Sequence, residues 1–370
     1  MDLERRVAGL AARVAPVDGE AGAAALLRHD RLVKPPGSLG RVEATGVRLA
    51  TIARACPPPV PRRPVVLIAA GDHGVLDQGV SPWPREVTAA MIAGFCSGTA
   101  AVNAIASTVG AEVLVVDVGV ASDLPAHPRL RRARVRPGTA DLSERPAMTR
   151  AEAAAGVLAG ATVAEDLIDG GADLLVTGDM GIGNSTPAAC LIAAFTGRPA
   201  AEVTGRGTGI DDATFSLKTG VVAHAIDLHR PDPGDALGVL AAVGGLEHAA
   251  LAGLILAGAA RRIPVVLDGV NAAAAALVAA ALRPEAVGYL LAGHRSVEPG
   301  AGAALDSLGL RPLLDLEMRL GEGTGGLLAV PIVVAAAAVL RDMATFDEAG
   351  VPLGQKGDGV PMGHREAGIG

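Results

Sequence analysis

VVLIAAGDHG, residues 65–74, decides the fold, because six consecutive apolar residues run directly into a loop that begins and ends with glycine. Such a run, followed by a loop and a helix, is typical of a parallel strand that is buried on both faces. Comparable strands are expected at 112–120, 173–178 and 265–269, within 286–302, and at 312–320. The sequence therefore predicts an α/β fold in which helices flank a mostly parallel six-stranded sheet.

A smaller helical part is expected outside this sheet. Between residues 2 and 29, apolar positions at helical spacing, interrupted at Pro16 and Gly19, predict two short amphipathic helices. The predicted organisation is a helical part at 1–60, a large α/β domain at 61–322, a C-terminal helix at 323–350 and a disordered tail at 351–370. The tail is predicted because its twenty residues include few apolar groups that could pack.

Composition excludes some classes of function. The chain of 370 residues has a formal net charge of -7, whereas non-specific nucleic-acid binding needs a basic surface, so no nucleic-acid partner is expected. Five arginines lie within 129–136 without aromatic residues between them, and we interpret this segment as a solvated face. Only 2% of the residues are aromatic, which predicts a core of small aliphatic side chains on closely spaced elements. The three cysteines form no CxxC pair, a pattern that fits neither a disulfide framework nor a zinc site.

The chain shows no clear export or membrane signal. Acidic and basic residues are mixed at positions 2–6, where a signal peptide would need a basic end and an apolar core, so a cytoplasmic location is expected. The longest uncharged run lies between Glu322 and Arg341 and approaches membrane length, but it contains Pro331. We expect a buried helix here and no membrane partner.

A single carboxylate, Glu322, lies between glycines in LGEGTGG, residues 320–326. The flanking glycines allow backbone conformations that are closed to other residues, so a substrate can approach the one acid in this turn. Glu322 is therefore a candidate catalytic group. Alternatively, a carboxylate at this position only favours the positive end of the following helix, an interaction of about 0.3 to 1 kcal/mol.

A glycine-rich turn follows the third strand in TGDMGIGNST, residues 177–186. Gly181 and Gly183 precede Asn184, which with the next two residues is suited to cap a helix; free N–H groups there predict a phosphate site. The spacing departs from GxGxxG, and no GxxxxGK[ST] is present, so neither an NAD nor an ATP site is supported. Asp179 in this turn either contacts a ribose hydroxyl or caps the turn.

A second glycine loop occurs in VTGRGTGIDDATFSLK, residues 203–218. Gly207 in this loop and Lys218 in the following helix suit the other side of a phosphate or ribose. The alternative is an ordinary helix start stabilised by two acids. Asp72 and His73 also fall at the ligand end of the predicted sheet, although a turn aspartate and a hydrogen-bonded histidine are a commoner explanation.

Six glycine-containing segments in this order resemble one enzyme family. KPPGSLGRVE, GDHGV, TGDMGIGNST, GRGTGIDD, GHRSVEPG and LGEGTGG together look like the nicotinate-nucleotide:dimethylbenzimidazole phosphoribosyltransferases, from about residue 30 to 348. The resemblance implies a Rossmann-like α/β domain, a small helical domain from both chain ends, and a homodimer whose active sites are lined partly by the partner subunit. It implies transfer of ribose 5-phosphate from nicotinate mononucleotide to 5,6-dimethylbenzimidazole, giving α-ribazole 5′-phosphate and nicotinate, with no cofactor and no metal.

The same resemblance implies roles for individual residues. Glu322 matches the family's general base, and Leu320 and Gly321 fall on its base pocket. The phosphoribosyl site is matched by Asp179, Gly181, Gly183, Asn184, Gly207 and Lys218.

Three positions depart from the family pattern. Asp179 stands where glutamate is common, Ala90 stands beside the base where glutamine is common, and Ala301 stands where histidine is frequent. The departures at Ala90 and Ala301 leave the preferred acceptor base open.

Two other functions stay open at this point. A nucleotide-dependent dehydrogenase would need GxGxxG with an acid about 20 residues later, which the sequence lacks. A non-catalytic nucleotide sensor would use the glycine loops only for binding. Incubation with nicotinate mononucleotide and dimethylbenzimidazole separates the hypotheses, because a sensor would saturate without releasing nicotinate.

Overall fold

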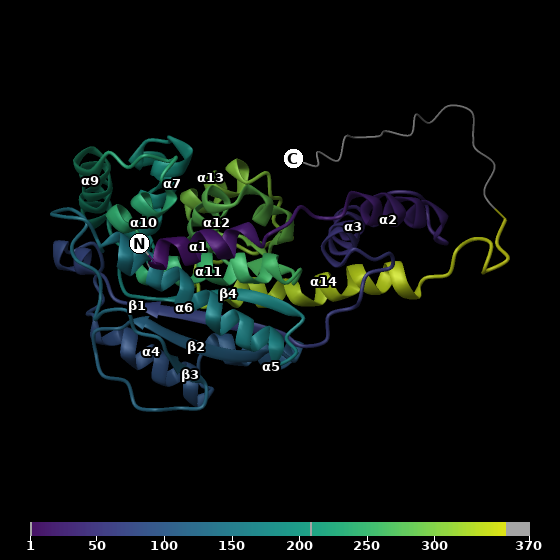
Figure 1. The fold of residues 1–370 in the computed structure, drawn as a ribbon, viewed down its shortest axis with the longest axis horizontal. Helices are drawn as coiled ribbons and strands as arrows, with labels where there is room; N and C mark the ends of the chain where they lie inside the picture. Colours follow the sequence, from purple (N-terminus) through teal and green to yellow (C-terminus); the bar gives the residue numbers. More distant parts are fainter. Residues whose placement is uncertain (1, 208, 353–370) are drawn as a thin grey trace. The chain divides into compact units, whose positions relative to one another are not determined.

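A six-stranded, all-parallel sheet is the central feature of the computed structural model, which describes residues 2–207 and 209–352 (Figure 1). The strand order is β3-β2-β1-β4-β5-β6, so the chain reverses its direction of winding between β1 and β4. The bounds are β1 Pro64–Gly71, β2 Glu112–Gly119, β3 Leu130–Arg132, β4 Leu174–Met180, β5 Val265–Leu267 and β6 Leu290–Ala292. Every residue of β1 and β4 is buried, and the predicted Rossmann-like α/β fold is confirmed.

The sixth strand is not the predicted one. The segment 312–320 contributes only β8 (Leu314–Asp315), which pairs with β7 (His294–Arg295) in a separate two-stranded sheet. The sixth strand of the main sheet is β3, which lies in the arginine-rich segment. Only its first residue is buried, because β3 is a short edge strand, and no apolar periodicity marks such a strand in the sequence.

Close helix packing surrounds the sheet. Helices α6 (Arg150–Asp169) and α11 (Leu246–Ala260) pack on one another and on β1 and β2. A Cβ atom at Gly160 would lie 1.9 Å from the carbonyl oxygen of Ala250, so only glycine permits this approach. The core of small aliphatic side chains follows the expectation from composition, because alanine and glycine allow the helices to come this near.

The remaining elements complete the fold. They are α1 Asp2–Ala12, α2 Gly19–Arg31, α3 Arg41–Ala53, η1 Gly74–Gln78, α4 Glu86–Ser97, α5 Ala101–Val109, α7 Ser185–Thr196, α8 Ala200–Val203, α9 Asp212–His229, α10 Ala236–Val243, α12 Val270–Leu282, η2 Pro284–Tyr289, α13 Pro299–Ser307 and α14 Thr324–Asp342. Two of these helices, α4 and α5, replace the single helix that the sequence suggests after the first loop.

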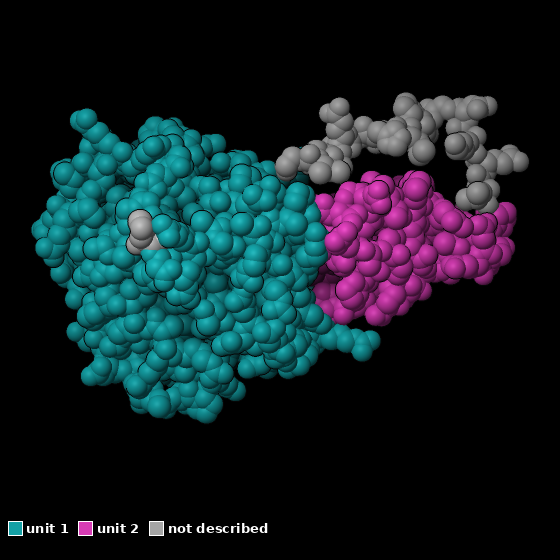
Figure 2. All heavy atoms as spheres, in the orientation of Figure 1, with its two compact units in different colours: residues 1–16, 62–330 teal, residues 17–61, 331–370 magenta. Residues whose placement is uncertain are grey.

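The chain forms two compact units, coloured separately in Figure 2: residues 1–16 with 62–330, and residues 17–61 with 331–370. The larger unit holds the sheet. In the smaller one, α2, α3 and the second half of α14 share a core of Ala25, Ala50 and Leu340. The part of the predicted tail at 353–370 lies outside the described residues.

The N-terminal helix differs from the prediction, which placed all of 1–60 in the small helical part. Residues 1–16 belong to the larger unit, where α1 packs on α6 and α11. Val7 and Leu10 are buried there, and Tyr289 donates a hydrogen bond to the carbonyl of Ala15 at 2.8 Å. Helical spacing identified the apolar face of α1, but spacing alone does not specify which surface covers that face.

Helix α14 contains the long uncharged run. By length and composition alone, α14 and the α4–α5 stretch could each cross a membrane. In α14, however, 56% of the most apolar window is buried inside the protein, as is typical of the core helix of a soluble fold. The expected buried helix is therefore present.

Candidate active site

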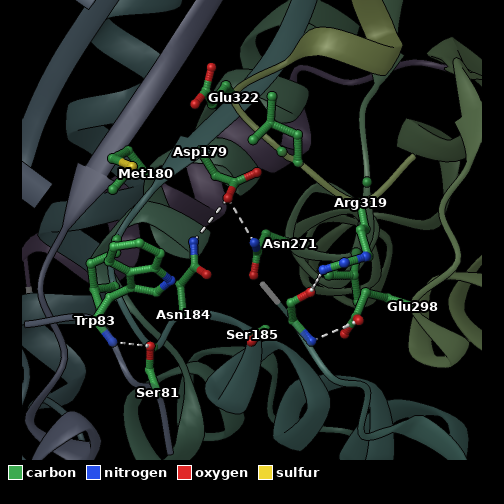
Figure 3. A pocket seen from close by; sticks show the side chains of 18 of the residues that line it. Ser81, Trp83, Asp179, Met180, Asn184, Ser185, Asn271, Glu298, Arg319 and Glu322 are labelled. Carbon is green, nitrogen blue, oxygen red and sulfur yellow. Dashed lines mark hydrogen bonds between the residues drawn. The ribbon is translucent and has the colours of Figure 1, made fainter. Parts of the chain in front are cut away.

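A cavity of about 380 Å³ lies in the larger unit, at the carboxyl ends of β4, β5 and the β6–β7 segment (Figure 3). Ligands of open parallel sheets bind at this end of the strands. Nine of the ten predicted site residues line the cavity: Asp179, Gly181, Gly183, Asn184, Gly207, Lys218, Leu320, Gly321 and Glu322. The fold thus brings together segments that are more than 140 residues apart in the sequence.

The tenth residue, Ala90, does not line the cavity. It is exposed on α4, whereas Val87 and Met91 on the same helix face the cavity. The prediction placed Ala90 beside the base from its position in a motif, and the helical repeat turns that position away. Ala301, another departure from the family pattern, is buried in α13 and also lies outside the cavity lining.

The turn that carries Glu322 has an unusual backbone. Gly321, Glu322 and Gly323 have φ angles of 85°, 64° and 91°, which place three successive residues in a region that favours glycine. A non-glycine residue held there indicates a constraint that is characteristic of functional sites. Asp268, at the end of β5, holds the turn by accepting hydrogen bonds from the N–H groups of Gly323 and Gly325 at 3.1 and 2.8 Å.

The Glu322 carboxylate is suited to accept a proton. Its residue is only 6% exposed, and Oε2 has no hydrogen-bond partner among the described residues. Burial raises the pKa of Glu322, the N–H of Val102 partly offsets that rise, and the charge of Asp268 adds to it. Glu322 is one of the residues that line the cavity, and a carboxylate whose pKa is raised by burial can act as a general base there.

Asp179 is the second carboxylate of the cavity. Its Oδ2 accepts hydrogen bonds from the side-chain amides of Asn184 at 2.9 Å and Asn271 at 2.7 Å, and Oδ1 has no partner among the described residues (Figure 3). Burial and the nearby charge of Asp268 raise the pKa of Asp179 to about 7. Asp179 therefore changes its charge near neutral pH.

The two glycine loops meet at the other side of the cavity. Lys218 is 1% exposed, and its Nζ donates to Ser185 Oγ at 2.8 Å and to the carbonyl of Gly205 at 2.9 Å. Burial lowers the pKa of Lys218. The basic residue behind the second loop thus lies at the start of the helix that follows the first loop.

One predicted donor is already engaged. The N–H of Gly207 donates to Glu298 Oε1 at 2.8 Å, and Arg319 donates to the carbonyl of Gly207 at 2.8 Å. The sequence suggested bare amides in both loops, but a carboxylate from α13's N-cap position occupies the second. The first loop differs: Asn184 is the N-cap of α7 but makes no capping bond, because its side chain binds Asp179. An anion can therefore approach the start of α7.

The opposite side of the cavity is apolar. Trp83, Val87 and Met91 line it, together with Leu320. Trp83 and Leu320 are 51% and 52% exposed, so they lie at the mouth of the cavity. Figure 3 shows Trp83 on one side of Asp179, and Arg319 and Glu298 on the other. The cavity therefore offers an apolar region and a polar region, with carboxylates between them.

Asp72 and His73 do not line the cavity. Asp72 Oδ2 accepts a hydrogen bond from the N–H of Ala121 at 2.8 Å, and His73 Nε2 lies 3.0 Å from Glu247 Oε1. Asp72 is thus a turn aspartate and His73 a histidine with a partner, which is the commoner of the two explanations that the sequence left open. Among residues 2–207 and 209–352, no group of three or more His, Cys, Asp or Glu side chains is arranged to hold a metal ion.

Sequence reasoning missed several residues that shape the site. Asn271, Asp268 and Arg319 were not singled out, although Asp268 ends a predicted strand and Asn271 follows three residues later. Their position after a strand was the available signal. Arg319 gave no such signal, because it lies in the segment that was interpreted as a strand.

Comparisons with known proteins agree on one family. A family model described as phosphoribosyltransferase matches residues 14–351. The nicotinate-nucleotide–dimethylbenzimidazole phosphoribosyltransferase of Salinispora tropica is 56% identical over 95% of this chain and 99% of its own length. The enzyme of the same name from Chloroflexus aggregans is 55% identical over 91% and 96%. A crystal structure of the Thermus thermophilus enzyme with this name superposes with a TM-score of 0.87, at 47% identity, over 91% of this chain and 100% of that one.

Proposed function

Because this chain belongs to the family of nicotinate-nucleotide–dimethylbenzimidazole phosphoribosyltransferases, we propose that it transfers the 5-phosphoribosyl group of nicotinate mononucleotide to 5,6-dimethylbenzimidazole. The products are α-ribazole 5′-phosphate and nicotinate, an intermediate and a by-product of cobalamin nucleotide-loop assembly. The observation that carries the proposal is the buried Glu322 carboxylate in the wall of a cavity that has one apolar and one polar region.

The phosphate of nicotinate mononucleotide binds at the start of α7. Gly181 and Gly183 bring the backbone close to it, and Asn184 does not cap the helix, so N–H groups and the positive end of the helix face the anion. Lys218 supplies a charged donor from the adjacent loop side. Gly207 contributes through its backbone, which Arg319 and Glu298 hold in place.

The flat acceptor ring binds against Trp83, Met91 and Leu320. These side chains exclude water from one side of the cavity without offering a hydrogen-bond acceptor at its centre. Gly321 leaves room for the ring beside Glu322, because it carries no side chain. Aliphatic and aromatic walls hold a planar apolar molecule by burial of its surface.

Glu322 acts as the general base. One ring nitrogen of dimethylbenzimidazole attacks C1′ with its lone pair, and the bond from C1′ to the nicotinate nitrogen breaks, returning its electron pair to the pyridine ring. The other ring nitrogen loses its proton to Glu322. Attack opposite the leaving group converts the β-nucleotide into an α-product. The cationic pyridinium leaves as a neutral ring, so no acid is needed to protonate it.

Asp179 faces the ribosyl carbon from the middle of the cavity. Its carboxylate stabilises the positive charge that develops on the sugar as the bond to nicotinate breaks. A fixed carboxylate in a site with little water is effective in this role, because the two amides of Asn184 and Asn271 hold it without reorganisation.

We propose that the enzyme works as a cytoplasmic homodimer. The apolar stretch Glu86–Val109 supports a dimer, because only 28% of its most apolar window is buried within the chain. A second copy that covers this stretch would bury it. Sedimentation equilibrium checks the assignment: a mass near 74 kDa, twice the 36.8 kDa of one chain, is expected, and a mass near 37 kDa would contradict it.

Product analysis tests the reaction itself. The purified protein is incubated with nicotinate mononucleotide and dimethylbenzimidazole, and the mixture is separated and read by mass. The expected result is equimolar nicotinate and α-ribazole 5′-phosphate. Saturable binding of nicotinate mononucleotide without nicotinate release would instead identify a nucleotide sensor.

A further inference from the structure

A series of neighbouring buried polar side chains leads through the protein core to the Asp179 carboxylate. It begins at His73, passes through Glu247 and His248 at the start of α11, and reaches Asp179 through Asn271 of α12. All of its members are at most 6% exposed. The proposed reaction uses only the last one directly, so the other buried polar groups need a separate explanation.

In the first part of this series, the Glu247 carboxylate lies between two histidine rings. Glu247 Oε1 lies 3.0 Å from His73 Nε2 and 2.9 Å from His248 Nδ1. Burial alone would raise the pKa of Glu247, but the attraction of the two histidines outweighs burial and holds that pKa well below its usual range. Burial alone would lower the pKa of His248, but Glu247 outweighs it and the pKa is raised. The pair therefore favours the charged forms, a Glu247 anion and a His248 cation.

The side-chain amide of Asn271 connects His248 to Asp179. Its Nδ2 donates to Asp179 Oδ2 at 2.7 Å, which leaves Oδ1 to face His248 Nε2 at 3.2 Å. In this orientation the carbonyl oxygen accepts, which requires a proton on that ring nitrogen. The other ring nitrogen, Nδ1, lies 2.9 Å from Glu247 Oε1. This arrangement is the one expected for a His248 ring that is protonated at both nitrogens.

The reversed amide corresponds to a different protonation state. If Asn271 turned over, its NH₂ group would face His248 and its oxygen would face Asp179. That arrangement is satisfied only when His248 has lost a proton from Nε2 and Asp179 has gained one at Oδ2. The observed orientation therefore matches ionised Asp179. Asn184 donates to the same Oδ2, which also matches a carboxylate.

We propose that His248 is a positioning residue for the transfer reaction: held as an imidazolium by Glu247, it fixes the Asn271 amide and favours the ionised form of Asp179 at the cavity wall. The inference rests on the proposed function for the role of Asp179 in the reaction. The charge coupling itself is a property of this chain, whether or not substrate is present.

The other charges around Asp179 make such a cation necessary. Asp268 at the end of β5 raises the pKa of Asp179, and so does Glu247 on α11, while Glu322 lines the same cavity. His294, which also lines the cavity, lies with its Nε2 3.5 Å from Asp268 Oδ1. His248 is the cation that lowers the pKa of Asp179 most among the described residues. Its removal therefore favours the protonated form of Asp179.

Titration of Asp179 tests the proposal without relying on turnover. The full-length protein is labelled with carboxyl-¹³C aspartate, and the signal that is absent from Asp179→Asn is followed with pH. The wild type is expected to titrate near the pKa of about 7. In His248→Gln the midpoint should rise by about one pH unit or more, because an opposite charge has been removed. His229→Gln is the control: His229 Nε2 pairs with the carbonyl of Leu142 at 2.7 Å, and His229 does not line the cavity, so this change should leave the midpoint unchanged.

A second variant covers the case in which His248→Gln does not fold with Glu247 partly unpaired. Glu247→Gln/His248→Gln removes both charges of the pair, and a smaller upward shift is expected, because Glu247 opposes the effect of His248 on Asp179. An unchanged Asp179 midpoint in whichever of these variants folds would overturn the proposal. An upward shift in either one supports it.

The pH profile of kcat/KM separates positioning from a structural role. The acid limb of His248→Gln should move to higher pH, with activity at pH 9 within about threefold of the wild type, whereas a merely structural defect lowers activity equally at every pH. A uniform loss would therefore overturn the proposal. If the wild type formed no product at all, the proposed function would fail, but the Asp179 titration would still decide the charge coupling.

Discussion

The Cα of Gly178 lies directly beneath the backbone carbonyl of Glu322: a Cβ atom at Gly178 would come within 2.7 Å of that oxygen. Gly178 is on β4, next to Asp179, and successive residues of a strand face opposite sides of the sheet. Gly178 therefore admits the Glu322 turn, while Asp179 reaches Asn271 and also lies beside Gly321 of that turn, where a Cβ atom would come within 3.4 Å of Asp179 Oδ2. One dipeptide positions both carboxylates of the site.

Gly178→Ala should displace the Glu322 turn. The added methyl group would also lie 3.0 Å from Ile68 Cγ1, so neither neighbour can move without disturbing the core. We expect a loss of about 1–3 kcal/mol in the free energy of unfolding and a lower kcat, measured by urea denaturation and nicotinate release. Gly220→Ala is the matched control, because a Cβ atom there meets nothing within 4 Å. Equal stability of the two variants would contradict the packing argument.

Asp179→Asn should flatten the dependence of stability on pH. The pKa of Asp179 is about 7 in the folded chain against a model value of 3.8, so the folded state binds its proton more tightly. The stabilisation of the folded state by its tighter binding of this proton is fully present at low pH, and it is lost as the pH rises from about 4 to 7. The wild type then carries a cost of at most about 4 kcal/mol at pH 8, which the amide removes.

Urea denaturation at pH 5 and pH 8 measures this cost. Relative to the wild type, Asp179→Asn should be stabilised more at pH 8 than at pH 5, while its kcat falls. Asp227→Asn on the exposed side of α9 is the control and should change neither value. If the difference in the free energy of unfolding between Asp179→Asn and the wild type were the same at pH 5 and pH 8, ionisation of Asp179 would not destabilise the fold and the prediction would be wrong.

Lys218→Met should weaken binding of the phosphate. The substitution keeps the buried aliphatic stem but removes the donor to Ser185 and the charge. Loss of a charge-assisted hydrogen bond of about 1.5–3 kcal/mol predicts a KM for nicotinate mononucleotide that is raised roughly 10- to 100-fold. The difference between variant and wild type should disappear with nicotinate riboside, which lacks the phosphate. A persisting difference would place Lys218 elsewhere in the mechanism.

Met91→Ala should change the preference among acceptor bases, whereas Ala90→Gln should not. Met91 lines the apolar side of the cavity, and Ala90 on the same helix is exposed. Competition between dimethylbenzimidazole and unsubstituted benzimidazole, read by product mass, compares the two variants. A larger effect of Ala90→Gln would mean that α4 meets the acceptor with its other face.

The sheet could be predicted because its central strands are marked by buried apolar runs. β1, β2 and β4 are long, and α6 begins at a recognisable capping residue, Thr149, which accepts a hydrogen bond from the N–H of Glu152. The short edge strand β3 could not be found, since a strand with one buried residue has no periodicity. The same limit explains why α1 was grouped with the wrong unit: its own sequence gives its apolar face but not the covering surface.

The candidate site was predictable where glycine loops follow strands, because those loops converge at one sheet edge. Asn271, Arg319 and the engagement of Gly207 by Glu298 could not be predicted. Each depends on which loops lie opposite one another in space, and a single sequence does not contain that information. The departure at Ala90 was over-interpreted, because the position in a motif does not specify which side of a helix faces the ligand.

The rate of nicotinate release by Glu322→Gln tests the account most directly. Glutamine preserves the shape of the side chain but cannot take the proton of the acceptor ring. We expect kcat to fall by at least about 100-fold, as for loss of a general base, with the thermal unfolding midpoint and the affinity for nicotinate mononucleotide unchanged. Turnover within a few-fold of the wild type would contradict the assignment of Glu322 as the base.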